Sequence, residues 1–156
     1  MAEVKAILNL GCGNKPIEGA VNHDRRIHSR WVDIAHDLNV FPWPWADAQF
    51  DVIRAWAVLE HLHCDRLDII NECWRILKPG GLLVAKLPYW NNEEAHDDIT
   101  HYWYTTLRQF AQFDPTTERG RDYGFYSPCK WKLVSSKYSN TGHSSIVHKL
   151  MKVVEE

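Results

Sequence analysis

Short apolar runs alternate with polar, turn-rich links along the first part of the chain. Five of these runs have the length and composition of buried strands, at residues 5–10, 20–24, 31–35, 50–56 and 82–87. Before the last run, apolar side chains recur with the spacing of one helix face, at Ile70, Cys73, Trp74 and Leu77. Asp65 can cap the start of that helix. Strands and a helix in this order predict an α/β fold with a mostly parallel sheet.

The end of the chain has a different pattern. Residues 130–138 and 145–153 alternate apolar and polar positions, and turn-forming residues lie between them at Asn140-Thr141-Gly142. This combination predicts a C-terminal antiparallel hairpin. The hairpin would complete the parallel sheet.

The region between the sheet strands and the hairpin is less regular. Thr105 or Thr106 can cap a helix, whose apolar positions would be Leu107, Phe110 and Phe113. Residues 114–128 are rich in turn formers and predict irregular structure.

The links after the first two strands are too short for full helices. We therefore expect reduced helices there and a sheet that is poorly covered on one face near its first strands. Such a face suits self-association, so we expect a homo-oligomer.

The amino-acid composition narrows the class of protein to which the chain can belong. A chain of 156 residues is long enough for one domain with a real core, and we expect a single domain over residues 1–156. The net charge of −2 argues against a protein held to nucleic acid mainly by its charge, but it leaves nucleic acid open as a substrate. The chain has no apolar run that could span a membrane and no signal-peptide pattern, so we expect no membrane contact. The 4 cysteines lack C-x-x-C spacing, which favours reduced thiols in the cytoplasm.

The first strand runs directly into Gly11-Cys12-Gly13. Glycine tolerates positive φ and lets the backbone approach a ligand. Ligands of open parallel sheets bind at the carboxyl ends of the strands, where this turn is expected to lie. By itself the turn is equally consistent with a purely structural role.

Later segments give the turn a context. In order and spacing, six segments resemble the class I S-adenosylmethionine-dependent methyltransferases: the glycine loop at 8–13, the segments at 36–45 and 50–53, the Glu60-His61 pair within 58–62, the turn at 77–83, and 101–105. The resemblance implies a three-layer Rossmann-like methyltransferase sheet, mostly parallel, with the antiparallel hairpin at its end. It also implies S-adenosyl-L-methionine as cofactor and methyl transfer to an unknown acceptor.

The resemblance also implies roles for single residues. The backbone of Gly11, Cys12 and Gly13 would approach the methionine part of the cofactor, and Asp24 would accept hydrogen bonds from the ribose hydroxyls. A carboxylate accepts and cannot donate, so it suits two hydroxyl donors. Because the loop before Asp24 is short, His23 or Arg25 is an alternative for this place, and a solvated loop acid is the structural alternative.

On the adenine side, the resemblance implies that Asp37 accepts from the amino group and that Leu38 packs on the base. Asp37 could alternatively cap a turn. Trp56 and Ala57, at the end of the fourth strand, would line the amino-acid part of the cofactor.

A base is needed only where the acceptor must lose a proton. Our candidates are His101 as general base and Asp98 as its orienter, and a polar lid loop is the alternative for this segment. His61, His63 and Cys64 invite a metal interpretation, but they lack a fourth ligand at a recognisable spacing, so we expect no metal.

Two other functions compete with methyl transfer. A non-catalytic S-adenosylmethionine-binding regulatory or partner protein would share the same loop and acids. A nicotinamide-dependent enzyme ranks last, because the glycine loop lacks the third glycine and the helix of that fingerprint.

Overall fold

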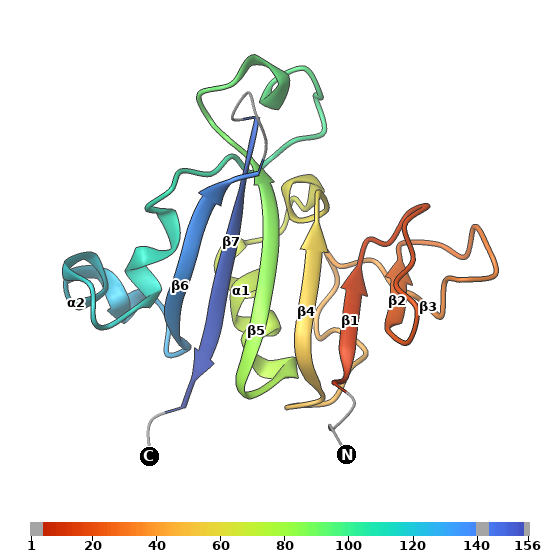
Figure 1. Ribbon diagram of the computed structural model, residues 1–156, viewed down its shortest axis with the longest axis horizontal. Helices are drawn as coiled ribbons and strands as arrows, with labels where there is room; N and C mark the ends of the chain where they lie inside the picture. The colour runs from red at the N-terminus through yellow and green to blue at the C-terminus, as the bar shows by residue number, and fades with distance from the viewer. Residues whose placement is uncertain (1–4, 140–143, 155–156) are drawn as a thin grey trace.

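The computed structural model describes residues 5–139 and 144–154. Seven strands form one sheet in the order β3-β2-β1-β4-β5-β7-β6 (Figure 1). Their bounds are β1 Ile7–Leu10, β2 Val21–Asp24, β3 Ile34–Ala35, β4 Phe50–Trp56, β5 Leu77–Pro88, β6 Lys130–Tyr138 and β7 Ser145–Val153. The helical elements are η1 Leu59–His61, α1 Arg66–Ile76, η2 Glu93–Ala95, η3 Gln109–Phe113, α2 Glu118–Tyr123 and η4 Gly124–Tyr126.

The pairing of the strands confirms the fold class. β1 pairs in parallel with both β2 and β4, β2 with β3, and β4 with β5. β7 pairs antiparallel with both β5 and β6. The sheet is therefore mostly parallel, with the antiparallel hairpin strands at one end, as the sequence predicts.

The helix α1 forms where the sequence predicts it. Asp65 caps its start by accepting a hydrogen bond from the amide of Leu67 at 2.7 Å. Its apolar face joins Leu8, Ile53 and Leu83 of the central strands in one buried core. The helix lies behind the sheet beside β5 (Figure 1).

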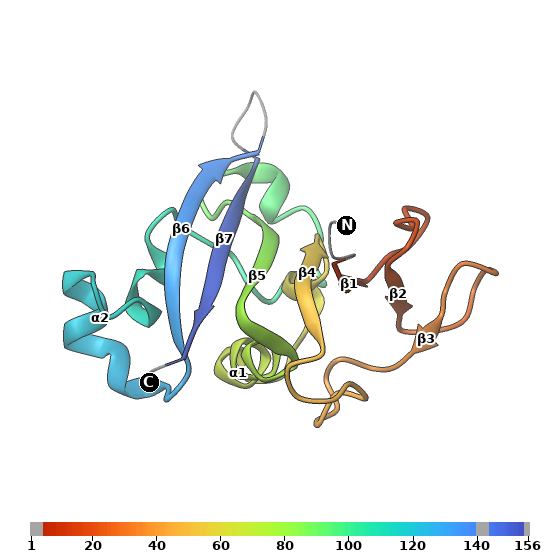
Figure 2. The same ribbon diagram turned by 60° about the horizontal axis from the view of Figure 1, so that its bottom comes forward.

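The helical layer lies on one face of the sheet. In Figure 1, α1 lies behind the strands, and β4, β5, β7 and β6 are seen unobstructed; Figure 2 shows α1 and the strands from below. Within the described ranges, no helix is drawn across that open face in Figure 1. Side chains at alternate positions, such as Val52, Leu82 and Met151, are half-buried on it. The thin coverage expected near the first strands thus extends over the later ones.

Three local expectations need correction. The third strand is a two-residue piece, Ile34–Ala35, instead of the expected 31–35. The helix expected after Thr105 or Thr106 is the short 3-10 turn η3. Thr105 cannot cap it, because its backbone bridges to Tyr89 and its hydroxyl binds buried His148 at 2.8 Å.

The turn-rich segment 114–128 contains the short helix α2, capped by Thr117, whose hydroxyl accepts from the amide of Gly120 at 2.9 Å. Both hairpin strands have their expected bounds. The turn expected at Asn140-Thr141-Gly142 lies outside the described residues.

Candidate functional site

A cavity of about 140 Å³ opens at the carboxyl ends of the parallel strands. It is lined by residues that follow or end β1, β2, β3 and β4: Gly11, His23, Asp24, Arg25, His36, Asp37, Leu38, Asn39, Val58, His61 and Leu62. Gly11, Asp24, Asp37 and Leu38, predicted from the sequence to bind one ligand, thus line one cavity.

Gly11 lies at the floor of this cavity with φ +60. A Cβ placed on Gly11 would approach Val58 Cγ2 to 2.5 Å, so the glycine is required by the packing of Val58 as well as by its backbone conformation. Its amide donates to Nδ1 of buried His23 at 3.4 Å, and Nε2 of His23 donates to the carbonyl of His36 at 2.9 Å. Burial lowers the pKa of His23, which fits a neutral ring with these two partners.

Asp24 ends β2 and ties the glycine loop to it. Its Oδ2 accepts from the amide of Gly13 at 2.9 Å, and its Oδ1 accepts from the amide of Arg25 at 2.7 Å. Burial raises the pKa of Asp24, but these amides and the neighbouring His28 outweigh that effect, so the pKa lies below its usual range. A carboxylate has about four acceptor positions, so each oxygen keeps capacity for a ligand hydroxyl.

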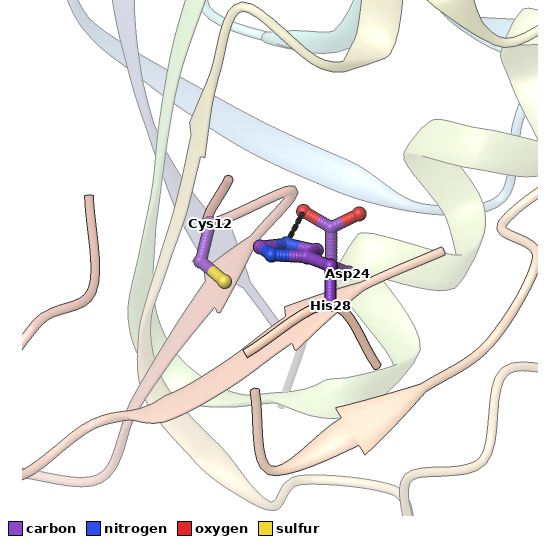
Figure 3. A group of neighbouring side chains, drawn as sticks. All are labelled: Cys12, Asp24 and His28. Carbon is purple, nitrogen blue, oxygen red and sulfur yellow. Dashed lines mark ion pairs between the residues drawn. The ribbon is translucent and has the colours of Figure 1, made fainter. Parts of the chain in front are cut away.

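Cys12 and His28 approach the same carboxylate (Figure 3). The Nε2 of His28 is 3.5 Å from Asp24 Oδ2, and one donor atom from each of the three residues lies within 4.8 Å of the others. Burial, followed by the charge of Asp24, raises the pKa of the Cys12 thiol, so the sulfur stays protonated. Cys12 is buried, and neither Cys12 nor Gly13 lines the cavity. Gly13 is linked to it only through its hydrogen bond to Asp24.

Asp37 follows β3 and also lines the cavity. Its Oδ1 accepts from the amide and the side-chain nitrogen of Asn39, at 3.0 and 2.9 Å, and its Oδ2 lies 3.2 Å from the guanidinium of Arg25. The hydrogen bond from the backbone amide of Asn39 is the main reason that the pKa of Asp37 lies below its usual range. Leu38 is buried beside it and adds an apolar wall.

Trp56 lies outside both the cavity just described and its neighbour, contrary to the role predicted for it. Strand alternation buries Ile53 and Ala55 and turns Trp56 to the open face. There its ring lies between Arg54, 4.6 Å from the ring centroid, and Lys86, 5.4 Å from it. The ring therefore acts as a platform for two cations on the open face.

A second cavity, of about 200 Å³, adjoins the first. It is lined by Ala57, Glu60, His61, Lys86, Leu87, Pro88, Glu94, Ala95, His101, Ser144 and Ser145. His61 lines both cavities. Ala57 belongs to this second cavity and has φ +54, an uncommon conformation for a residue with a side chain. Such strain is concentrated at functional sites.

Glu60 is the most unusual group of the second cavity. It is 3% exposed, and burial raises its pKa to about 7. Its Oε2 has no hydrogen-bond partner within residues 5–139 and 144–154. Burial also lowers the pKa of His61, which favours the neutral ring.

His101 and Asp98 are arranged differently from the predicted base and orienter. The Nδ1 of His101 donates to the carbonyl of Ala95 at 2.8 Å, and Asp98 Oδ2 lies 3.8 Å from Nε2, the nitrogen that would act as base. The other oxygen of Asp98 accepts from the amide and hydroxyl of Thr100 at 2.8 and 2.6 Å. Ala95, not Asp98, therefore orients the ring.

The comparisons with known proteins agree with this fold. Residues 20–85 match a family model described as a methyltransferase domain. A Mycolicibacterium smegmatis protein, named as a probable S-adenosylmethionine-dependent methyltransferase, is 39% identical over 71 residues, which are 46% of this chain and 26% of the relative. The chain thus matches about a quarter of that relative's length.

Two solved structures superpose on nearly the whole chain. One is from the complex between a Haloferax volcanii methyltransferase activator and a methyltransferase, with TM-score 0.66, 13% identity, and 97% of this chain and 84% of that chain covered. The other is a Burkholderia thailandensis 1,6-didemethyltoxoflavin-N1-methyltransferase with 1,6-didemethyltoxoflavin and S-adenosylhomocysteine bound. It gives TM-score 0.65 and 16% identity over 96% of this chain and 72% of that chain.

The chain has the class I S-adenosylmethionine-dependent methyltransferase fold. The resemblance seen in the sequence is confirmed by the family model, the curated relative and the solved structures. This methyltransferase fold has an unusually thin helical layer after its first strands, as expected from the short links.

Sequence patterns missed several residues of the candidate site. The first cavity is also lined by His36, Asn39, Val58 and Leu62, which fall within the segments 36–45 and 58–62 but were given no binding role from the sequence. Glu60 was noted only as part of the Glu60-His61 pair. Its isolation from hydrogen-bond partners depends on the surrounding fold, which no sequence pattern reveals.

Proposed function

We propose that this chain transfers a methyl group from S-adenosyl-L-methionine to an acceptor that is still unidentified. The observation that supports this best is the cavity that gathers Gly11, Asp24, Asp37 and Leu38 at the carboxyl ends of the parallel strands. Ligands of this fold class bind at that edge.

The residues of the cavity fit the proposed cofactor. Two carboxylates whose pKa values lie below their usual range line the cavity, and both remain charged acceptors at neutral pH. Asp24 would hold the ribose hydroxyls and Asp37 the adenine amino group, with Leu38 against the base. The cavity is smaller than the 300–1,000 Å³ of a typical ligand pocket, so part of the cofactor would lie at its open mouth beside exposed Arg25.

The chemistry asks little of the protein beyond position. S-adenosylmethionine supplies an already activated methyl group. The task of this chain is to align an acceptor and to keep water away, which accounts for much of the rate in such reactions. His61, which lines both cavities, and Ala57, which lines the second, would stand beside the reacting groups.

His101 as general base, with Asp98 nearby, remains a proposal. The His101 Nε2 lies on the side of the second cavity, where an acceptor would enter. The pH dependence of the rate in wild type and in His101→Gln would test this role.

Isothermal titration with S-adenosylmethionine and S-adenosylhomocysteine tests the main proposal. We expect both ligands to bind wild type, and we expect Asp24→Ala and Asp37→Ala each to bind at least tenfold more weakly, since each loses a charged acceptor. Absence of binding by wild type would refute the proposal. Binding without any S-adenosylhomocysteine production over a panel of acceptors would favour the non-catalytic binding protein.

We further propose that residues 1–156 act as one domain and that the protein works in the cytoplasm. The thiols of Cys12, Cys64, Cys73 and Cys129 are all free, which supports a reducing compartment. Within the described ranges, none of the helices has the length and apolar character that crossing a membrane requires.

We propose that self-association uses the open sheet face. The face combines half-buried Val52, Leu82 and Met151 with the cations Arg54 and Lys149. Two copies face to face would bring like charges together, so association should strengthen as salt screens them. Sedimentation velocity at low and high salt measures this, and Leu82→Asn should weaken the association. A monomer at every salt concentration would refute it.

A further inference from the structure

We propose that Glu60, His61 and His101 form a binding site for one divalent transition-metal cation. The site lies at the carboxyl end of β4, beside the cofactor cavity. One donor atom from each residue lies within 4.8 Å of the other two. Atoms bound to one zinc ion lie about 3–4 Å apart, given bond lengths of about 2.0–2.2 Å, so small side-chain rotations would close the site.

The backbone holds the two segments of the site together. Glu60 and His61 belong to η1, and His101 belongs to the loop after β5. The amide of Tyr102 donates to the carbonyl of Glu60 at 2.6 Å, which fixes the loop against η1. As a result, the rings of His61 and His101 lie with their centroids 4.8 Å apart.

The hydrogen bonds set the tautomer of both histidines. A carbonyl only accepts, so the bond from His101 Nδ1 to Ala95 places the proton on Nδ1 and leaves the lone pair on Nε2. His61 Nδ1 lies 2.8 Å from the Thr100 hydroxyl, whose own proton is donated to Asp98 at 2.6 Å. His61 Nδ1 therefore also carries the proton, and its Nε2 has the free lone pair.

This arrangement is the one found around metal-binding histidines. A ligating histidine almost always donates the N–H of its other ring nitrogen to a carbonyl or carboxylate, either directly or through a bridging group such as water. Here Ala95 serves His101 directly, and Asp98 serves His61 through Thr100.

Glu60 supplies the independent observation. Its side chain lines the second cavity and is buried, and its Oε2 has no hydrogen-bond partner in the described part of the chain. Burying a carboxylate oxygen without a partner is costly, and native proteins satisfy nearly all such atoms. A cation held between Glu60 and the two histidines would satisfy it.

The donor set indicates the class of ion. Two imidazole nitrogens and one carboxylate suit zinc, iron(II), manganese or cobalt. Three protein ligands leave coordination positions open, and these would face the cavity lined by Lys86, Pro88 and Ser145. If the proposed methyl transfer holds, on which this step rests, the open positions select an acceptor with a hydroxyl or carboxylate oxygen.

The group of Cys12, Asp24 and His28 does not compete as a metal site. The carboxylate oxygens of Asp24 already accept amides from Gly13 and Arg25, and the thiol of Cys12 stays protonated. A metal ion there would have to displace contacts that hold the glycine loop.

Titration of the tag-free, chelator-treated full chain with Co²⁺ and Zn²⁺ tests the site. We expect one equivalent to bind, with visible cobalt absorption typical of a low-coordinate site. His61→Gln and His101→Gln should each lower the affinity at least tenfold, and Thr100→Val, which removes a supporting contact, about tenfold. His63→Gln is the matched control, since His63 is adjacent in sequence and outside the cluster, and it should bind like wild type.

Circular dichroism of each variant separates lost ligands from lost folding. No binding of either ion by wild type, or equal binding by folded His61→Gln and His101→Gln, would overturn the site. Titration with S-adenosylmethionine in the presence of chelator keeps the two proposals apart, because cofactor binding should survive metal removal. A coordinated His101 Nε2 has no lone pair left for base catalysis, so metal binding would also exclude the base role.

Discussion

The amide of Gly13 donates to Oδ2 of Asp24 at 2.9 Å, so the glycine loop and the end of β2 form one unit. Asp24→Asn keeps an oxygen for this amide but loses the charge, whereas Asp24→Ala loses both. We expect Asn to cost less than about 1 kcal/mol of stability and Ala about 1–2 kcal/mol. Both should bind S-adenosylmethionine at least tenfold more weakly. Urea unfolding and calorimetric titration measure the two effects, and unaltered binding by Asp24→Ala would show that the ribose assignment is wrong.

Gly11 and Gly13 make a matched pair. A Cβ on Gly11 would lie 2.5 Å from Val58 Cγ2, whereas a Cβ on Gly13 would meet nothing within 4 Å, and both residues have positive φ. Gly11→Ala should therefore destabilise by about 2–4 kcal/mol, and Gly13→Ala by about 1 kcal/mol from its backbone alone. The double variant Gly11→Ala with Val58→Ala should recover part of the loss. Equal losses for the two single variants would contradict the packing explanation.

The loop that contains Trp43 depends on Glu72. Its Oε1 accepts from the buried amide of Trp43 at 2.7 Å, and Arg75 contacts both of its oxygens. Glu72→Ala leaves these donors without their acceptor, so we expect a loss of about 2–4 kcal/mol in urea unfolding. Asp47→Ala is the control: Asp47 also pairs with Arg75, but its side chain is 79% exposed, so it should cost less than about 1 kcal/mol. The interpretation fails if both variants cost the same.

His148 makes stability depend on pH. Burial lowers its pKa from 6.5 to about 4. Between these values the unfolded chain binds a proton that the folded chain does not, so stability falls as pH falls, by up to about 1.4 kcal/mol per pH unit. His148→Gln can keep contacts to Thr105 and Ser136, which lie 2.8 and 2.7 Å from the ring nitrogens. From pH 7 to pH 5 wild type should lose about 2 kcal/mol more than this variant in urea unfolding; parallel losses would refute the assignment.

The sequence predicts the fold better than the site. Residue periodicity locates β4, α1 and both hairpin strands, because their side chains alternate or repeat regularly. It fails at η3, because Thr105 bonds to His148, which is 43 residues away in the chain. Local patterns cannot register such a tertiary contact.

Within the site, the sequence predicts the positions of residues at strand ends better than it predicts which way a side chain on a strand points. Asp24 and Asp37 line the cavity because strand ends meet there. Trp56 does not line the cavity. Consecutive side chains along a strand point to opposite faces of the sheet, and the sequence does not show where β4 ends relative to the cavity. The partnerless oxygen of Glu60 depends on packing around it.

The strand order has a consequence for synthesis of the chain. β7 lies between β5 and β6, although it follows both in sequence. Until β7 leaves the ribosome, the edge of β5 has no neighbour and β6 has no place in the sheet. An exposed edge of this kind pairs readily with other chains. The nascent protein should therefore be most prone to aggregation just before its last strand is made, and a chaperone that covers β5 would help most at that moment.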